Sequence, residues 1–344
     1  MKFVLAPLAG FTDAPFRRLC SEGGADLVYT EMVSAAGLFH GSSPTRHLME
    51  TMPGEGNVAC QLFGAKEEEL AFSAALVERE FTDRFVELNL NAGCPMTKVT
   101  REGAGAKLIE NPDKIYRLLK AITENTALPV TLKTRLGQHP AKTNIFEIAD
   151  AAERAGAKGL IVHARYTSQM HGGAVHLDTL AELVGKTKLT VIGNGSVTDA
   201  KTAAAMAETG VQGLMIGRAA LSNPSIFSDL RGQTPNFGGQ TPISGGQTLQ
   251  NWGQTPENWG QALIEKEDKL ANCRRHLEYL LQFRKQLAER YPNDHIPGED
   301  GYASVKMHTH LFRYFNGRPG AAALRARLNS VRTLAEINDI ISSV

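Results

Sequence analysis

One cysteine of this chain stands in a setting that suits chemistry, because Cys94 lies between glycine and proline in the segment Asn91-Ala92-Gly93-Cys94-Pro95. A thiol in such an exposed loop can serve as a nucleophile, a metal ligand or an acid. No second cysteine or cluster of histidines accompanies it as a metal partner, and no obvious base is present to activate it as a nucleophile. The remaining role is that of a neutral thiol that donates a proton. That role matches the reduction of an alkene, which needs one hydride and one proton.

The other cysteines give a different signal. Cys20 and Cys60 lie in apolar stretches, where we expect a thiol to be buried and inert. The four cysteines are far apart and form no Cys-x-x-Cys pair, so we expect neither a metal site nor a disulfide framework. The short apolar run at the N-terminus lacks the flanks of a signal peptide, and no uncharged stretch is long enough to span a membrane. We therefore expect a cytoplasmic protein without a metal.

Further polar residues follow a series of short apolar runs that are typical of buried β-strands. The expected strands are Phe3–Leu8, Leu27–Thr30, Val58–Phe63, Phe85–Leu90, Val130–Thr134, Gly159–His163, Leu189–Gly193 and Gly213–Gly217. Each run ends at a polar residue or a glycine-bearing turn. In order these are Pro7-Leu8-Ala9-Gly10, Glu31, Gln61, Asn89 with Asn91, Lys133 with Arg135, His163 with Arg165, Asn194-Gly195 and Gly217-Arg218.

Helical patterns fill the stretches between these runs, as over 67–80, 112–124, 145–155 and 199–208. Apolar strands that alternate with helices indicate a parallel sheet covered on both faces. Eight such units in about 230 residues fit a closed barrel better than an open sheet. The fold class that we predict is therefore α/β, a (β/α)₈ TIM barrel. The strand ends of such a barrel meet at one mouth, where this polar ring would seat a polar cofactor.

Two turns within this ring predict a phosphate site. Asn194-Gly195-Ser196 and Gly217-Arg218-Ala219 follow the seventh and eighth strands, where barrels commonly bind phosphate through backbone N–H groups. Glycine lets the backbone approach the anion, and Arg218 adds a positive charge. Either turn alone could be an ordinary connection, but the two lie on adjacent strands.

Two side chains of the ring suit the ring system of a flavin. Lys133 ends an otherwise apolar run, so its ammonium would point into the mouth, where it would stabilise an anionic reduced flavin. Gln61 can both donate and accept hydrogen bonds, as an amide edge of a flavin requires. The competing interpretations are a lysine that extends to solvent and an amide that only bonds a loop.

The composition changes after Arg231. The pair Gly-Gln recurs every seven residues from 232 to 260, in a segment rich in Gly, Pro and Thr that lacks the apolar positions of a coiled coil. We expect a disordered insertion, and the alternative is a small binding element built on Trp252 and Trp259. Helical patterns resume over 269–290, 302–315, 321–328 and 334–341, which indicate a bundle. The predicted domains are a barrel over 1–231, the insertion over 232–260 and a helical domain over 261–344.

The two predicted folded parts differ only slightly in net charge. Residues 1–230 carry 23 Lys and Arg against 25 Asp and Glu, whereas residues 261–344 carry 13 against 10. A mildly basic helical domain could meet phosphates, and an ordinary solvated surface explains the same numbers equally well.

Taken in order, these motifs resemble those of the tRNA-dihydrouridine synthases, which are flavin enzymes with a barrel and a C-terminal helical bundle. The resemblance covers most of the chain outside 232–260. It is carried by LAPLAGFTDAPFR at 5–17, TEMVSA at 30–35, CQLFG at 60–64, ELNLNAGCPMTKVTREGAGAKLIENP at 87–112, PVTLKTRLG at 129–137, IVHARYTSQMHGG at 161–173, VIGNGSVTD at 191–199 and MIGRAALSNPSIF at 215–227. The KVTREGAGA stretch and the VKMHTHLFRYF segment look most like the bacterial B-type branch.

The resemblance implies FMN as cofactor, NADPH as reductant and tRNA as substrate, handled by a monomer. It implies that Cys94 protonates uracil C5 after the flavin delivers hydride to C6. The implied flavin-binding residues are Pro7, Leu8, Ala9, Gln61, Lys133 and His163, with Asn194, Gly195, Ser196, Gly217 and Arg218 on the phosphate. Asn91 and Arg135 would contact the target uridine. Candidate contacts to the RNA, each also readable as an ordinary surface charge, are Lys98, Arg101, Arg165, Lys306 and Arg313.

Some positions carry residues that differ from those usual in the family. Leu8 stands where methionine is common, and His171, Leu177 and Ser225 replace frequent aromatic residues. These changes bear on loop packing and the fit of RNA rather than on redox chemistry.

Two other functions stay open. One is a barrel reductase of a free pyrimidine or another small molecule, for which a second basic domain would be superfluous. The other is a non-catalytic tRNA-binding protein, which would not need Cys94 and Lys133.

Overall fold

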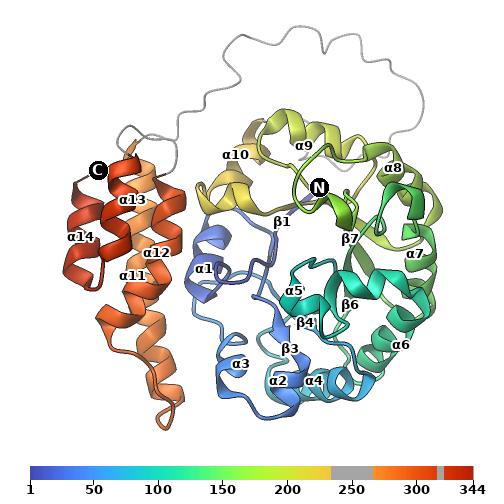
Figure 1. Ribbon diagram of the computed structural model, residues 1–344, viewed down its shortest axis with the longest axis horizontal. Helices are drawn as coiled ribbons and strands as arrows, with labels where there is room; N and C mark the ends of the chain where they lie inside the picture. The colour runs from blue at the N-terminus through green and yellow to red at the C-terminus, as the bar shows by residue number, and fades with distance from the viewer. Residues whose placement is uncertain (234–265, 316–320, 344) are drawn as a thin grey trace, which may run out of the picture.

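The computed structural model describes residues 1–233, 266–315 and 321–343, and Figure 1 shows them as a barrel with a helical domain at its side. The segment 234–265 holds most of the heptad repeat and lies outside the described residues, so its predicted disorder stays a prediction. Residues 232 and 233 still belong to the last helix of the barrel, α10 (Ile226–Gln233).

The barrel is built from parallel strands that close into a ring. Its strands are β1 (Lys2–Leu5), β2 (Leu27–Tyr29), β4 (Val58–Phe63), β5 (Glu87–Ala92), β6 (Val130–Arg135), β7 (Gly159–His163), β8 (Thr190–Asn194) and β9 (Gly213–Ile216). Neighbouring strands pair in chain order, β1 also pairs with β9, and β2 pairs with β4, which completes the closure. The predicted fold class is therefore confirmed, and every predicted strand is present.

Most strand ends shift by one to three residues from the prediction, two of them for a clear reason, and one short strand was not predicted. β1 stops at Leu5, because the Leu8 backbone turns back on Thr12: its N–H donates to Thr12 Oγ1 and its carbonyl accepts from the Thr12 N–H. β5 continues to Ala92, since Ala92 still pairs with Thr134 of β6. A short strand, β3 (Val33–Ser34), adds to the far end of β4.

Helices cover the outside of the barrel, and side-chain caps fix several of their starts. α1 (Ala14–Glu22) begins at Asp13, whose carboxylate accepts from the Phe16 N–H, and Asn111 and Asp199 cap two later helices in the same way. The other helices are α2 (Ala35–Phe39), α3 (Ser43–His47), α4 (Glu67–Glu80), α5 (Thr97–Thr100), α6 (Pro112–Thr123), α7 (Ile145–Arg154), α8 (Leu177–Lys186) and α9 (Ala200–Ala207). Within the described residues, no helix is both long and apolar enough to cross a membrane.

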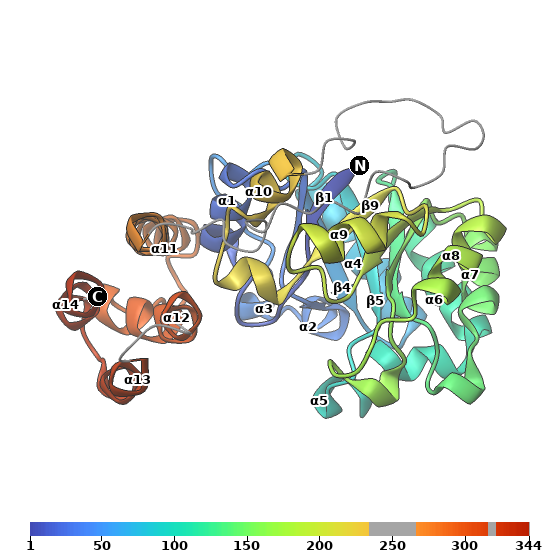
Figure 2. The same ribbon diagram turned by 90° about the horizontal axis from the view of Figure 1, so that it is seen from above.

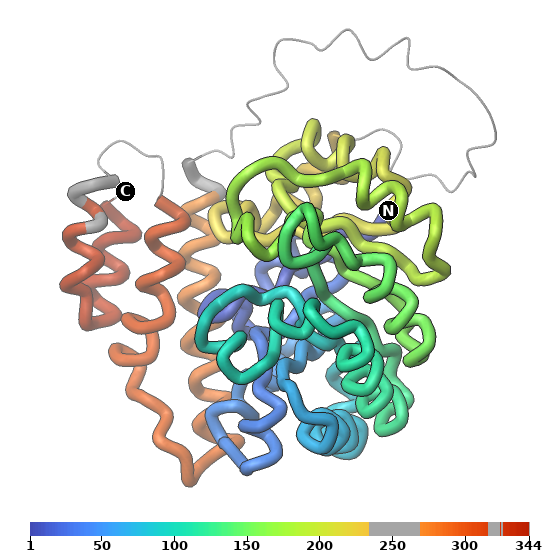
Figure 3. The backbone as a smooth tube through the Cα atoms, turned by 45° about the vertical axis from the view of Figure 1, so that its right-hand side comes forward, coloured from blue at the N-terminus to red at the C-terminus, as the bar shows by residue number. Residues whose placement is uncertain are grey.

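The C-terminal domain contains α11 (Lys266–Arg290), α12 (Glu299–Tyr314), α13 (Ala321–Ser330) and α14 (Leu334–Ser342). Its apolar core is continuous with side chains of the barrel, because Ala14 and Leu19 of α1 pack into it. Figure 3 shows the domain against the N-terminal part of the barrel.

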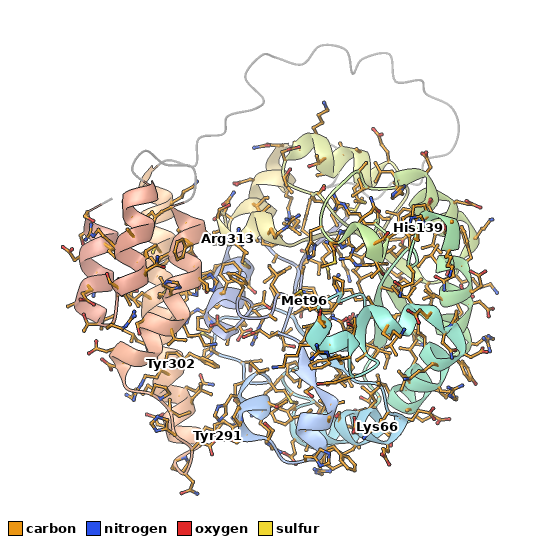
Figure 4. All side chains as sticks on the ribbon, in the orientation of Figure 1. Lys66, Met96, His139, Tyr291, Tyr302 and Arg313 are labelled. Atoms are coloured by element: carbon orange, nitrogen blue, oxygen red, sulfur yellow. The ribbon has the colours of Figure 1, made fainter. Side chains whose placement is uncertain are left out.

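Polar contacts also join the two domains. Glu50 is almost fully buried and accepts from Arg84 of the barrel and from Tyr291, beyond α11, at 2.6 Å. Arg290 Nε lies 3.1 Å from the same carboxylate. Figure 4 shows Tyr291 and Tyr302 on the side of the helical domain that faces the barrel.

Candidate active site at the mouth of the barrel

The polar residues predicted at the strand ends meet at one mouth of the barrel, as the closed barrel requires. Strand register sets Asn91 beside Lys133, Arg135 beside His163, and His163 beside Asn194. Side chains two residues apart point to the same face of a strand, so Asn89 and Asn91 share a face of β5. Figure 2 shows α5, which follows the Cys94 loop, at the end of the barrel opposite the N-terminus.

Cys94 is partly exposed, whereas Cys20 and Cys60 are completely buried, as the sequence predicted. Burial raises the pKa of both buried thiols, that of Cys60 to about 12. Asn91 shapes the loop of Cys94, since its Oδ1 accepts from the N–H groups of Gly93 at 3.1 Å and Cys94 at 3.0 Å. The thiol is therefore held on a defined turn beside the mouth.

A chain of hydrogen bonds runs through the barrel interior to this loop. Asn91 donates from Nδ2 to Gln61 Oε1 at 2.8 Å, and Gln61 donates from Nε2 to Asn89 Oδ1 at 2.7 Å. Asn89 in turn donates to Thr131 Oγ1, which donates to Glu87. Each amide has one orientation that satisfies this chain. Gln61 thus uses both ends of its amide inside the protein, and one N–H remains for a ligand.

Two cations stand beside the thiol. Lys133 lies half-buried with one hydrogen bond, to Asn194 Oδ1 at 3.4 Å, and burial followed by the charge of Arg135 lowers its pKa to about 8. Arg135 is buried, and its guanidinium donates to the carbonyl groups of Gly93, Tyr166 and Met170. Burial lowers the pKa of Arg135 to about 10, and a charge on Cys94 acts in the opposite direction on both cations.

His163 and Arg165 connect the mouth to the next loops. His163 Nε2 lies 3.1 Å from Arg165 Nη1, and burial, with the surrounding cations, lowers the pKa of His163 far below its usual range. A neutral imidazole is therefore the form present near neutral pH. Arg165 also donates to the Gly173 carbonyl at 2.8 Å and to Ser196 Oγ at 2.6 Å. Its side chain is 4% exposed, so it organises these loops from inside the protein.

The two glycine-bearing turns follow β8 and β9, and the first of them has an unusual backbone conformation. Gly195 has φ +120° and Ser196 has φ +56°, so two successive residues adopt positive φ and turn their N–H groups out of the regular strand pattern. Gly217 precedes a short 3₁₀ helix, Arg218–Leu221, at the end of β9. Arg218 is exposed and makes no hydrogen bond or ion pair to the described parts of the chain.

The first turn closes the ring. Pro7 and Leu8 are partly buried and Ala9 is exposed, and the Gly10 N–H donates to the Glu31 carboxylate. The predicted backbone contact of Pro7, Leu8 and Ala9 with a flavin stays a prediction.

The sequence and this geometry agree with one family of known proteins. The family model described as Dihydrouridine synthase (Dus) matches residues 4–342. The chain belongs to the dihydrouridine synthase family. The chain is 36% identical to tRNA-dihydrouridine synthase B of Klebsiella pneumoniae over 231 aligned residues. The alignment covers 67% of this chain and 71% of that protein. The probable tRNA-dihydrouridine synthase of Treponema pallidum is 36% identical over 236 residues, 66% of this chain and 69% of that protein. Among solved structures, morphinone reductase aligns over 67% of this chain and 85% of its own, with 14% identity and a TM-score of 0.46.

The cations that the dihydrouridine synthase resemblance assigned to RNA fall into two groups. Lys98 and Arg101 are exposed at α5, next to the Cys94 loop, and Arg313 is exposed on α12 with its guanidinium 5.9 Å from the Phe11 ring. Arg165 is buried, and Lys306 Nζ lies 3.7 Å from Asp13 and 4.0 Å from Glu31. Both side chains thus have contacts within the protein, and their predicted contacts to RNA stay predictions.

Sequence reasoning missed two partners of the site in this dihydrouridine synthase. Thr131 relays the hydrogen-bond chain, and Met32 Sδ lies 3.1 Å from Asn91 Nδ2. Thr131 stands two residues before Lys133, so alternation along the strand was the signal that would have found it.

Proposed function

We propose that this chain is a cytoplasmic tRNA-dihydrouridine synthase that reduces the C5=C6 bond of uridines in tRNA, with Cys94 as the proton donor. The observation that carries the proposal is a partly exposed thiol beside Lys133 and Arg135 in a chain of this family. The named relatives act on tRNA, and a tRNA substrate is the simplest use of the second, mildly basic domain.

The residues of the mouth fit FMN. Lys133, Arg135, Arg165 and Arg218 converge there, and none of them forms an ion pair with a carboxylate of the described residues. Cations without counter-ions suit a phosphate. We assign the phosphate to Gly195, Ser196, Gly217 and Arg218, supported by Asn194. We assign the ring and its side chain to Pro7, Leu8, Ala9, Gln61, Lys133 and His163. When bound, reduced FMN supplies the hydride for uracil C6 and NADPH reduces it between turnovers.

Cys94 completes the reduction at the other carbon. Its S–H bond breaks as a C5–H bond forms, and the electron pair of the S–H bond stays on sulfur. The thiolate that results stands near two cations, Lys133 and Arg135, which stabilise a negative charge at this place. Solvent then returns a proton to the sulfur before the next turnover. The same cations therefore make proton donation easier and hold the thiolate until it is reprotonated.

The substrate must leave its stack to reach this thiol. A uracil paired or stacked in folded RNA cannot lie inside a barrel mouth, so it has to be flipped out. Lys98 and Arg101 at α5 are placed to meet the flanking phosphates, since both are exposed next to the Cys94 loop. We assign Asn91 and Arg135 to the edge of the pocket, where their side chains already order the loops that surround the base.

The test compares Cys94→Ala with Cys20→Ala, a change at a fully buried thiol on α1. Purified protein is expected to be yellow, and both variants are expected to bind FMN and tRNA. Dihydrouridine formation, measured by mass spectrometry of tRNA nucleosides, should fall about 100-fold or more only in Cys94→Ala. Full activity in that variant would remove Cys94 from its role. Colourless protein that cannot be reconstituted with FMN would overturn the flavin assignment.

A second test, with different substrates, distinguishes our proposal from the nearest alternative, a reductase of a free small molecule. The enzyme is offered a tRNA transcript, free uridine and uracil at equal concentrations of the base. Our proposal expects turnover of the transcript alone. Equal turnover of a free base would favour a small-molecule reductase.

A further inference from the structure

Three ionisable side chains meet at the junction of the two domains. Asp13 comes from the start of α1, His276 from α11 and His310 from α12. One ligand atom of each residue lies within 4.8 Å of the other two. All three side chains are buried, with exposed fractions of 7%, 0% and 1%.

The histidines of this cluster have nitrogen atoms without a partner. His276 Nε2 and both ring nitrogens of His310 make no hydrogen bond to the described residues. The Phe11 carbonyl is close enough to raise the pKa of His310 but lies outside hydrogen-bond geometry. Buried polar atoms are almost always paired, so three unpaired nitrogens in one place point to a missing ligand.

We propose that Asp13, His276 and His310 bind a divalent transition-metal ion, and that zinc fits this donor set best. Two imidazoles and a carboxylate are ordinary zinc ligands, and a water completes a tetrahedron. Tetrahedral zinc separates its donor atoms by about 3.3 Å, so small side-chain rotations close the cluster on an ion. The sequence led us to expect no metal, because the ligands come from distant segments of the chain.

The contacts around the cluster suit this assignment. Tyr314 OH lies 3.2 Å from His276 Nδ1, so it can accept that N–H and leave the lone pair on Nε2 for the metal. Burial lowers the pKa of both histidines, and the neutral form is the one that binds metals. The Asp13 Oδ1 that caps α1 also keeps the carboxylate oriented.

One charge opposes a cation at this place. Lys306 Nζ lies 3.7 Å from Asp13 Oδ2, but Glu31 offers it an alternative partner at 4.0 Å. Glu31 Oε1 is buried and has no hydrogen bond to the described residues. A metal at Asp13 would shift the ammonium of Lys306 towards Glu31 and so satisfy both groups. A cavity of about 180 Å³ lined by Asp13, Glu31 and Lys306 adjoins the carboxylate of the cluster.

The position of the site assigns it a role. Asp13 belongs to the barrel, whereas His276 and His310 belong to the helical domain, so one ion would join the two domains. It would fix the orientation of the helical domain relative to the mouth. None of the three ligands is a residue that we assign to the reduction, so the ion would take no part in it.

The experiment measures zinc in the full-length protein after stripping with a chelator, incubation with zinc chloride and desalting. We expect about one zinc ion per chain in the wild type and less than about a tenth of that in His276→Gln/His310→Gln. His308→Gln is the matched control, since His308 lies on α12 against Phe312 and outside the cluster. Lys306→Gln is expected to bind zinc more tightly because it removes the opposing charge.

X-ray absorption at the zinc edge of the wild type keeps the test independent of how the variants fold. Two imidazole nitrogens, further oxygen ligands and no sulfur are expected. A sulfur ligand would show that the ion sits on a cysteine instead. Zinc that is not retained by the wild type, or that is retained equally by the double variant, would overturn the proposal and leave a buried water as the missing ligand.

Discussion

The side-chain oxygen of Asn91 accepts a hydrogen bond from the backbone N–H of Cys94 at 3.0 Å. The other end of the same amide donates to Gln61, which is anchored in turn to Asn89 in the barrel interior. The loop that carries the thiol is therefore fixed by the barrel itself rather than by its own short sequence. Asn91 is thus a positioning residue for Cys94, in addition to its assigned contact with the uridine.

Asn91→Ala should misplace the thiol and destabilise the fold. The change leaves Gln61 Oε1 and two loop N–H groups unpaired, which costs about 2–3 kcal/mol in the free energy of unfolding. We expect dihydrouridine formation to fall at least about ten-fold through kcat, with little change in KM for tRNA. The control is Asn57→Ala, an exposed residue with one 3.2 Å hydrogen bond to the Asp26 carbonyl. Equal effects of the two variants would contradict the positioning role.

Gly195→Ala should disrupt the proposed phosphate turn. Gly195 has φ +120°, and an added Cβ would lie 2.9 Å from His163 Cδ2 and 3.0 Å from Val175 Cγ1. We expect a loss of about 2 kcal/mol in the free energy of unfolding and much weaker FMN binding. Gly185→Ala is the matched control, since Gly185 is exposed within α8 and has open space around it. That change should stabilise the protein by about 0.5–1 kcal/mol. Urea unfolding and fluorescence titration with FMN measure both.

The fold was predictable because its signals are local. The run Val58–Phe63 is β-rich and apolar except for Gln61, and the structure places β4 over the same residues. Helix α4 also begins and ends where its pattern predicted, over Glu67–Glu80. The ends of β1 and β5 were less predictable. They depend on a hydrogen bond between Leu8 and Thr12 and on the pairing of Ala92 with Thr134.

The ring of site residues was predictable for a second reason, since a closed parallel barrel brings all strand ends to one mouth. The partner of each side chain was not. Lys306 suggested a contact to RNA, but its position on α12 sets it against Asp13 and Glu31 of the barrel. Such pairings depend on how two domains dock, and no periodicity in the sequence reports that.

Glu50→Gln should loosen the junction of the domains. The buried carboxylate pairs with Arg84 and Arg290 and accepts from Tyr291. Removing its charge leaves Arg84, 13% exposed, with only the exposed Asp83 carboxylate at 3.9 Å, which costs about 3 kcal/mol. Glu80→Gln is the control, because Glu80 is a third exposed and pairs with Arg46 and Arg79 at the surface, where such pairs contribute about 1 kcal/mol or less. Urea unfolding gives the difference. Hydrogen exchange should also rise near the end of α11 in Glu50→Gln alone.

Lys133 should make the stability of the cofactor-free protein depend on pH. The pKa of its ammonium falls from 10.5 to about 8 on folding, chiefly through burial. Between these values the unfolded chain holds more protons than the folded one, so the contribution of Lys133 to the free energy of unfolding rises with pH. Below pH 8 both states are charged, and the full cost of burying the charge is present. Lys133→Met should therefore stabilise the protein by about 2 kcal/mol at pH 7, an advantage that shrinks as the pH rises above 8.

Urea unfolding at several pH values between 7 and 9.5 measures this difference. The control is Lys158→Met, a change at an exposed lysine, which should alter the free energy of unfolding by less than about 0.5 kcal/mol. A constant difference between wild type and Lys133→Met across this range would contradict the lowered pKa. The stabilised variant should also bind FMN less tightly and form less dihydrouridine, because it lacks the cation beside Cys94. A variant that is more stable but less active indicates that the charge of Lys133 serves the chemistry. Replacing a residue that serves only the fold would lower both stability and activity.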